Sequence, residues 1–307
     1  MTAPHLTLLT SADWHDYELL DSGNLKKLER FGDFRFIRPE PQAMWQPRLD
    51  ADSWVADGVY RRDKNDLRNN DAGGWHLSKS VPDSWQMRYQ KLRFLARPTP
   101  FRHLGFFPEQ AAHWNWCADK IHQFQQRHNR HPRILNLFAY SGLASLHAAA
   151  AGAEVTHVDA SKKAIAQAFE NRDACGLQDT PIRFITDDAI GFVAREIRRR
   201  RTYDGIIMDP PKYGRGPKGE TWRLEEDLRC LLGQATDLLS GDALFLVLTI
   251  YAIRASSMAA HFTLLDALKE RPGSIEAGEL AIEESALPGG DTRRYVSQAN
   301  FARWAAY

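Results

Sequence analysis

The stretch Arg133–Gly142, with the sequence RILNLFAYSG, decides the fold. Residues 133–139 form a nearly unbroken apolar run, which is typical of a strand that is buried on both faces of a parallel sheet. Small residues follow at once, and the alanine-rich stretch 141–153 indicates a helix. We therefore predict a strand that passes through a tight turn directly into a helix. In sheets of this kind, ligands lie at the carboxyl ends of the strands.

Strand and helix patterns alternate on both sides of this stretch. A helix is predicted at 108–128, and Ser161 and Gly176 suit the start and the end of a second helix. Further strands are predicted at 154–160, 182–189, 203–211 and 243–252, with helices at 161–177, 190–201 and 228–240. The final stretch, 293–304, is expected to add antiparallel edge strands. This alternation predicts an α/β fold with a Rossmann-like, doubly wound, mostly parallel sheet.

Residues 1–96 differ in composition from the rest of the chain. They are rich in Trp, Pro, Gly, Asp and Arg, and their short apolar runs are separated by turn signals at 21–24, 38–41 and 69–74. We predict a small, β-rich, mostly antiparallel N-terminal domain at 1–96, with a possible role in binding the substrate, and the α/β domain at 97–307. The many aromatic residues before position 117 either fill the core of the small domain or provide stacking surfaces.

Composition limits the classes of function. The chain has 307 residues and a net charge of +1, which is not the strongly basic balance of a nucleic-acid coat protein, although a local basic face is enough for phosphate contacts. We see no apolar run long enough to cross a membrane, and the first residues lack a secretory pattern. The three cysteines stand alone, so we expect no disulfide framework, no metal site and a cytoplasmic location.

Two of the predicted strand ends carry candidate ligand-binding residues: a turn with one glycine, and a carboxylate. The turn 138–142 has one glycine where dinucleotide-binding proteins have G-x-G-x-x-G, so it suits a ligand without a pyrophosphate. A plain strand–helix turn is the alternative. Asp159, at the end of the next strand, is placed to accept hydrogen bonds from both hydroxyls of a ribose. Its alternative role is to cap the following helix, but Ser161 already suits that task.

The other two strand ends are acidic. At Asp187-Asp188 we expect Asp188 to accept a hydrogen bond from an adenine amine, with a solvated helix start, favoured by the helix dipole, as the alternative. The last motif is Asp209-Pro210-Pro211-Lys212-Tyr213, in which two prolines end the strand and hold a fixed turn. An acidic group, a lysine and an aromatic ring are then presented at the mouth of a cleft. A simple strand stop is the alternative.

Taken in order, these four strand ends resemble the successive motifs of class I S-adenosylmethionine (SAM)-dependent methyltransferases. Within that superfamily, LNLFAYSG (135–142), DPPKY (209–213) and GFFPEQ (105–110) resemble the ribosomal large-subunit RNA methyltransferases. The resemblance covers residues 100 to about 255, whereas the N-terminal domain does not match the usual RNA-binding module of that family. The resemblance implies SAM as the cofactor and a base in ribosomal RNA as the methyl acceptor.

The resemblance also implies roles for individual residues. Catalytic roles fall on Asp209, Lys212 and Tyr213: Asp209 orients a donor on the acceptor base, while Lys212 and Tyr213 position the base and stack on it. The cofactor contacts are assigned to Gln110, Phe138, Tyr140, Ser141, Gly142, Asp159, Ser161, Asn171, Asp188 and Asp209. The basic run 198–201 is either a solvated helix end or a phosphate contact.

The cysteines bear on the mechanism. Carbon-5 methylation of cytosine needs a cysteine nucleophile, which in the similar RNA cytosine methyltransferases follows the Leu-Thr of the fifth strand. Here the corresponding segment, 248–254, reads LTIYAIR and has no cysteine. We therefore predict direct transfer to a nitrogen or an oxygen, without a covalent enzyme intermediate. Cys117, Cys175 and Cys230 are expected to be small buried residues.

Three other functions remain open. A methyltransferase of the same fold that acts on a small molecule or a protein is slightly favoured by the near-neutral charge. A non-catalytic RNA-binding protein with a vestigial fold is disfavoured by the intact Asp159 and DPPKY motif. A nicotinamide-dependent dehydrogenase is disfavoured by the missing G-x-G-x-x-G.

Overall fold

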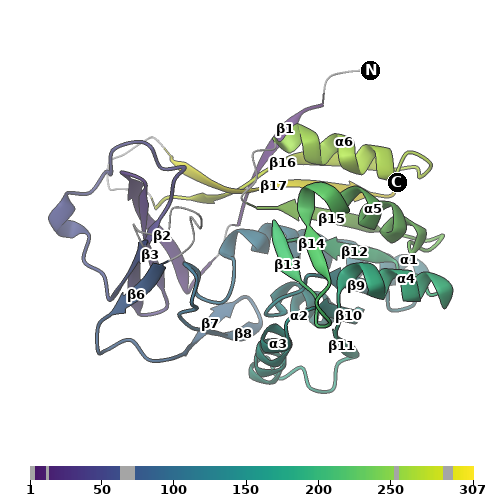
Figure 1. The fold of residues 1–307 in the computed structure, drawn as a ribbon, viewed down its shortest axis with the longest axis horizontal. Helices are drawn as coiled ribbons and strands as arrows, with labels where there is room; N and C mark the ends of the chain where they lie inside the picture. The colour runs from purple at the N-terminus through teal and green to yellow at the C-terminus, as the bar shows by residue number, and fades with distance from the viewer. Residues whose placement is uncertain (1–3, 12–13, 63–72, 252–255, 286–292) are drawn as a thin grey trace. The chain divides into compact units, whose positions relative to one another are not determined.

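The computed structural model describes residues 4–11, 14–62, 73–251, 256–285 and 293–307 (Figure 1). Contacts divide the chain into two compact units. The first, which we call the α/β unit, comprises Met1–Leu9, Gln110–Leu280 and Gln298–Tyr307. The second, the β unit, comprises Thr10–Glu109 and Ala281–Ser297. The domain boundary that we placed between residues 96 and 97 stays a prediction.

An eight-stranded sheet forms the centre of the α/β unit, in the order β1-β16-β17-β15-β12-β9-β10-β11. Its parallel part consists of β9 (Arg133–Leu137), β10 (Glu154–Asp159), β11 (Ile182–Thr186), β12 (Gly205–Met208) and β15 (Phe245–Ile250). The chain places β10 and β11 on one side of β9, then β12 and β15 on the other. The strand order therefore reverses between β9 and β12, where open α/β sheets bind ligands. The predicted doubly wound, mostly parallel sheet is confirmed.

Helices cover both faces of this sheet (Figure 1). One hydrophobic cluster joins α1 (Ala111–His128) and α2 (Leu143–Ala150) to strand residues such as Ile134, and α3 (Lys162–Ala174) contacts α2. A second cluster joins α4 (Ala189–Arg198), α5 (Leu224–Asp237) and α6 (Ser257–Ala267) to residues such as Leu135. Successive residues of a strand face opposite sides, so Ile134 and Leu135 show that β9 is buried on both faces. This burial explains the unbroken apolar run.

The antiparallel strands differ from the prediction. The last strand, β17 (Tyr295–Ala305), pairs antiparallel with β15, but it is not an edge strand. The sheet continues beyond it through β16 (Ser274–Glu283) and β1 (Leu6–Thr10), so β1 and β11 are the edges. Sequence analysis missed β16 because its many Glu, Ala and Gly residues have low strand propensity. A side chain at Gly278 would overlap the backbone of Thr7, so glycine permits the pairing with β1.

The β unit is β-rich, as predicted. A five-stranded sheet contains β2 (Tyr17–Gly23), β3 (Lys26–Phe31), β4 (Phe34–Pro39), β5 (Gly58–Arg62) and β6 (Gly73–Leu77), and β7 (Trp85–Tyr89) pairs with β8 (Leu92–Ala96). Only the β4–β5 pair among these strands is parallel. Phe31, Phe36, Tyr89 and Phe94 are buried, so many of the N-terminal aromatic residues fill a core. The predicted turn at 69–74 lies mostly outside the described residues.

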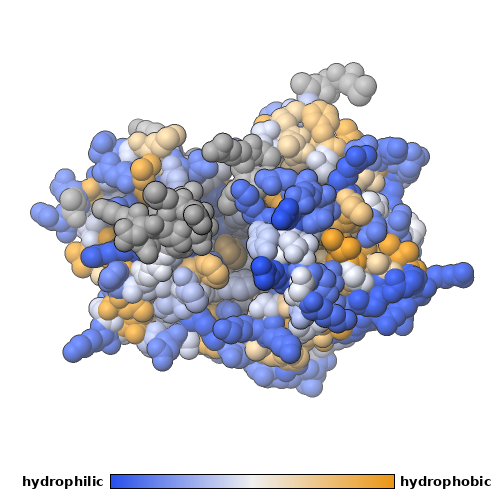
Figure 2. Space-filling view, in the orientation of Figure 1, coloured by the Kyte–Doolittle hydropathy of each residue, from blue (hydrophilic) through white to orange (hydrophobic). Residues whose placement is uncertain are grey.

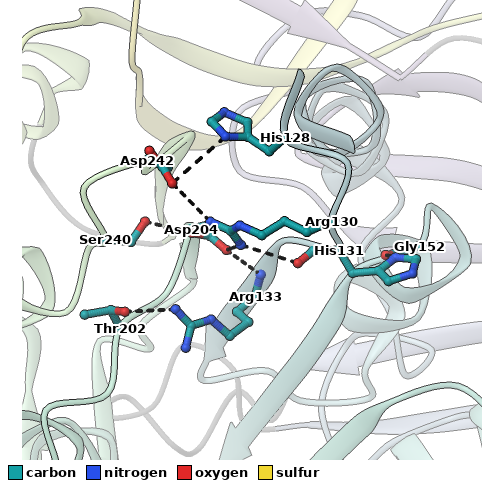
Figure 3. A network of polar contacts seen from close by, with 9 residues as sticks. All are labelled: His128, Arg130, His131, Arg133, Gly152, Thr202, Asp204, Ser240 and Asp242. Atoms are coloured by element: carbon teal, nitrogen blue, oxygen red, sulfur yellow. Dashed lines mark hydrogen bonds and ion pairs between the residues drawn. The ribbon is translucent and has the colours of Figure 1, made fainter. Parts of the chain in front are cut away.

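A polar network ties together the amino ends of the parallel strands (Figure 3). Asp204, next to β12, is 0% exposed and accepts hydrogen bonds from the Arg130 guanidinium at 2.7 and 3.0 Å. It also accepts from the Arg133 backbone at 2.8 Å and from the Ser240 hydroxyl at 2.7 Å. Burial alone would raise the pKa of Asp204, but these hydrogen bonds lower it. The network stabilises the amino ends of the parallel strands, whereas the predicted site lies at their carboxyl ends.

Within the part of the chain that the structure describes, no helix has the length and apolarity needed to cross a membrane.

Candidate functional site

The turn after β9 has an unusual backbone. Phe138 and Tyr140 adopt left-handed conformations, with φ of 56° and 47°, and Gly142 follows with φ of 88°. A left-handed conformation costs a residue other than glycine roughly 1–2 kcal/mol, and such strain persists where the surroundings enforce it. Here the Tyr140 backbone N–H donates to Asp159 at 2.8 Å, and the Asn171 amide donates to the carbonyl of Ser141 at 2.9 Å. The predicted residues of the turn are thus held by two other predicted site residues.

Both conformation and space favour glycine at position 142. A Cβ at this position would lie 3.0 Å from the Cβ of Ala168 in α3. Gly142 also begins α2, and no side chain in the described structure caps that helix. The N–H groups of the first helical turn therefore remain as hydrogen-bond donors beside the turn.

Asp159 ends β10 next to the same turn. Its two carboxylate oxygens accept from the backbone N–H groups of Tyr140 and Ser161, both at 2.8 Å. Each oxygen has a second lone pair, so the carboxylate can accept two more hydrogen bonds. Burial raises the pKa of Asp159 even though both backbone contacts lower it. The hydroxyl of Ser161 caps α3 by accepting from Ala164 at 3.3 Å, as the sequence predicted, so Asp159 is not needed for that task.

The next strand end has a clear structural role. Asp188 is the N-cap of α4, and its side chain accepts from the backbone of Gly191 at 2.8 Å. Asp187 forms an ion pair with Arg195. The structure therefore supports the interpretation of Asp188 as a helix start. The contact of Asp188 with an adenine remains a prediction.

Three elements bring polar side chains together at the carboxyl edge of the sheet. Gln110, just before α1, donates through its Nε2 to Asp209 at 3.0 Å and to the hydroxyl of Tyr251 at 3.1 Å. Asp209 follows β12 and Tyr251 follows β15. Sequence analysis placed Gln110 and Asp209 at the site but missed Tyr251. Its signal was its position, because it follows the Leu-Thr of the fifth strand where only a cysteine was sought.

The motif DPPKY continues into a hairpin that the sequence analysis did not predict. Its strands are β13 (Tyr213–Arg215) and β14 (Thr221–Arg223). Lys212 is exposed, and Tyr213 is 52% exposed. The hydroxyl of Tyr213 accepts from Arg215 at 3.2 Å, and this hydrogen bond lowers the pKa of Tyr213. Both side chains are thus exposed to solvent shortly after the strand end that carries Asp209.

A buried polar chain lies behind the glycine turn and was also missed. The Asn136 amide donates to the Ser145 hydroxyl at 2.9 Å, and that hydroxyl lies 3.0 Å from Nδ1 of His157. Burial lowers the pKa of His157 to about 3, so the ring is neutral. The signal in the sequence was a single polar residue, Asn136, inside an apolar strand. Buried polar groups of this kind must be paired, and paired groups fix local geometry.

One secondary prediction needs correction, and a second is narrowed to one of its two alternatives. Cys117 is buried, but Cys175 is half-buried and Cys230 is exposed, because Cys230 lies on the solvent face of α5. The basic run 198–201 begins at the last residue of α4, a helix that starts at the carboxyl ends of the parallel strands and returns to their amino ends. There Arg199 pairs with Glu196 at 3.1 Å. This location favours the solvated helix end over a phosphate contact at the predicted site.

Known proteins resemble this chain in sequence and in fold. A family model described as S-adenosylmethionine-dependent methyltransferase matches residues 13–284. The crystal structure of a SAM-dependent methyltransferase from Agrobacterium tumefaciens is 44% identical, covers 99% of this chain and 95% of its own, and superposes with a TM-score of 0.92.

Curated relatives match a shorter part of the chain. A ribosomal RNA large subunit methyltransferase K/L from Shewanella baltica is 38% identical over 110 residues, which are 35% of this chain and 15% of the relative. Its counterpart from Shewanella frigidimarina is 36% identical over 116 residues, 36% of this chain and 16% of the relative. This chain thus spans about one sixth of the length of the curated relatives that it matches. The sheet, the strand-end motifs and the family match lead to one assignment: the chain belongs to the S-adenosylmethionine-dependent methyltransferases.

Proposed function

We propose that this protein transfers the methyl group of SAM to a base in RNA, with ribosomal RNA as the first candidate, and that no covalent enzyme–RNA adduct forms. One observation carries the proposal. The strained turn 138–142 with Asp159, and Asp209 with Gln110 and Tyr251, lie at the carboxyl ends of β9, β10, β12 and β15, around the switch in strand order. A nucleoside site and a polar acceptor site therefore share one sheet edge.

The residues around the turn fit SAM. The donors of α2 and the left-handed turn suit the charged methionine part, which carries a carboxylate. Asp159 has two lone pairs left for the ribose hydroxyls after it has bound Tyr140 and Ser161. Phe138, Ser141 and Asn171 would complete this side of the pocket, and Asp188 would lie toward the adenine. When bound, SAM supplies a methyl group on a sulfonium, which is already a good leaving group.

The protein's contribution is alignment. Gln110 holds one oxygen of Asp209 and the hydroxyl of Tyr251, so these acceptor-side groups have fixed positions. Asp209 would orient a donor on the acceptor base, while Lys212 and Tyr213 at the mouth would position and stack on the base. Alignment of acceptor, methyl and sulfur can supply roughly 7–11 kcal/mol of the barrier.

The RNA acceptor is supported by the names of the relatives, which are ribosomal RNA large subunit methyltransferases. The direct route is supported by the positions of all three cysteines. Cys117 lies in α1, Cys175 follows α3 and Cys230 lies in α5, so none is placed at a strand end that faces the site. Burial raises the pKa of Cys117 well above its usual value, which suppresses its thiolate. Three free thiols also suit a reducing cytoplasm.

The test is to incubate the protein with methyl-tritiated SAM and under-methylated large-subunit ribosomal RNA, and then to identify the labelled nucleoside. Asp159→Ala should weaken SAM binding, and Asp209→Ala should mainly slow turnover. Label that survives nuclease and sits on protein or a small molecule would refute the RNA proposal. A stable adduct with RNA that contains 5-fluorocytosine would refute direct transfer.

A further inference from the structure

The β13–β14 hairpin has two chemically different faces. Its register pairs Tyr213 with Arg223, Gly214 with Trp222, and Arg215 with Thr221. Directly opposed residues of an antiparallel pair share one face, and successive residues alternate between faces. One face therefore carries Gly214 and Trp222, and we call it the inner face. The other, which we call the outer face, carries Tyr213, Arg215, Thr221 and Arg223.

The inner face is anchored beside the candidate site. Trp222 is only 7% exposed, and its indole N–H donates to the carbonyl of Pro211 at 2.7 Å. The ring of Trp222 lies 4.9 Å from the ring of Phe138, which belongs to the strained turn. In addition, the backbone of Leu224 donates to the carbonyl of Lys212 at 3.0 Å, which closes the base of the hairpin. The hairpin is thus held against the strained turn and against the segment that follows Asp209.

The outer face is exposed and cationic. All four of its side chains are exposed, and Tyr213 presents half of its ring to solvent. Residues 212–223 contain four cations (Lys212, Arg215, Lys218 and Arg223) and a single acid, although the whole chain has a net charge of only +1. In the region of Figure 2 where Figure 1 draws the hairpin, strongly hydrophilic residues lie next to residues of intermediate hydropathy.

These cations are available for a ligand. Within the described residues, no carboxylate forms an ion pair with Arg215, whose guanidinium contacts the Tyr213 hydroxyl. Arg223 pairs with Glu226 at 3.0 Å, but both side chains are more than half exposed, at 57% and 63%. Exposed pairs of this kind contribute little and exchange readily for other partners.

We infer that the outer face of the β13–β14 hairpin is a docking surface for the acceptor RNA, with Arg215, Lys218 and Arg223 on phosphates and Tyr213 stacked on a base. This inference rests on the proposed function, because it takes the acceptor to be RNA. An exposed ring between guanidinium groups matches the alternation of bases and phosphates along a single strand. An acidic protein would need the cations but not the exposed ring.

Position supports the same conclusion. The hairpin follows Asp209 by a few residues and is held against Phe138, so an RNA on its outer face lies next to the acceptor side of the site. The other basic segment, 198–201, is at the opposite edge of the sheet. The hairpin therefore supplies the phosphate contacts at the correct edge.

The experiment compares two double variants of the full chain. Arg215→Gln/Lys218→Gln removes one arginine and one lysine of the hairpin. The matched control, Arg127→Gln/Lys269→Gln, removes the same residue types at exposed positions. Arg127 lies in the last turn of α1 and Lys269 follows α6, both at the amino ends of the parallel strands. Binding of a short fluorescein-labelled single-stranded RNA is measured at salt concentrations from roughly 50 to 200 mM. SAM binding and methylation of the ribosomal RNA transcript are measured in parallel.

The hairpin variant should lower the slope of log affinity against log salt by about 0.7 for each lost phosphate contact, or about 1.4 in total. The KM for the RNA should rise, while the affinity for SAM stays within about twofold of that of the wild type. Tyr213→Ala should weaken RNA binding by about 5- to 150-fold, and Tyr213→Phe should retain most of the affinity. The control variant should match the wild type.

Three negative results are distinguishable. If RNA is methylated by the wild type, but the hairpin variant keeps the wild-type salt slope and KM, the docking surface is refuted and the proposed function stands. If the wild type labels only protein, the proposed function fails and the docking surface fails with it. A hairpin variant that loses SAM affinity as strongly as RNA affinity also counts against docking, because its defect is then structural.

Discussion

Replacing Asp159 by asparagine isolates the charge of the carboxylate that we place on the ribose. Asparagine has almost the same shape, but it keeps one acceptor oxygen and turns an NH2 group toward the other partner. In the structure both partners, the backbone N–H groups of Tyr140 and Ser161, lie 2.8 Å from the carboxylate. The variant therefore loses one charge-assisted hydrogen bond in the cofactor-free protein and at least one to the bound ribose.

The two losses have different sizes. A hydrogen bond to a charged group contributes roughly 1.5–3 kcal/mol, which corresponds to a loss of about 10- to 150-fold in SAM affinity. In the cofactor-free protein the burial of the Asp159 charge is unfavourable and raises its pKa. Asparagine is neutral, so the variant avoids this cost, which offsets the lost hydrogen bond. We therefore expect the free energy of unfolding without SAM to change by less than about 1 kcal/mol.

Titration calorimetry with SAM measures the first quantity, and chemical denaturation without SAM measures the second. Asp242→Asn is the control, because this carboxylate is 55% exposed and lies in the network at the opposite edge. An Asp159→Asn protein that binds SAM within about twofold of the wild type would refute the ribose assignment. If the free energy of unfolding falls strongly and the loss of SAM affinity is no larger than this loss of stability explains, Asp159 is instead a structural support of the turn.

The remaining predictions concern pH, the turn and the opposite edge. Because the pKa of Asp159 is raised, its protonation should weaken SAM binding at a higher pH than for an ordinary aspartate, and calorimetry across the acidic range should find this loss absent in Asp159→Asn. Gly142→Ala should lower the free energy of unfolding by about 1–2 kcal/mol in chemical denaturation, because φ is 88° and the new Cβ meets Ala168; an unchanged midpoint would contradict this. Asp204→Asn should cost about 1–3 kcal/mol at neutral pH. Its folded pKa is lowered, so the stabilisation is present above the pKa of the unfolded chain and is lost as the pH falls through the folded pKa. Thermal unfolding should therefore find a weaker acid dependence in this variant than in the wild type, and equal dependence would contradict the assignment.

The parts of the fold that were predictable from sequence are those set by local pattern. The buried strand and turn at 133–142, the cap at Ser161 and the acidic strand ends follow from hydrophobic runs and from single residues with strong preferences. The two prolines of 209–213 were correctly interpreted as the end of a strand, but they hid the hairpin that follows. Its strands are only three residues long each, too short for an alternating pattern to be seen.

Other features depend on contacts between distant parts of the chain. The pairing of β1 with β16 joins residues from the two ends of the sequence, and no local pattern encodes it. The contact of Gln110 with Tyr251 likewise needs the folded sheet to bring β15 next to β12. Asp188 illustrates a different limit, because a carboxylate that caps a helix and one that contacts a ligand look alike in sequence.

The place of β1 bears on how this protein can be divided for study. Removal of residues 1–96 would delete β1 and expose the backbone hydrogen-bonding groups of β16 along a long free strand, which is a template for intermolecular pairing. It would also leave residues 281–297 without most of their compact unit. A shortened chain of this kind should precipitate or form β-rich oligomers during expression, whereas one that keeps residues 6–10 joined through a linker should stay dispersed.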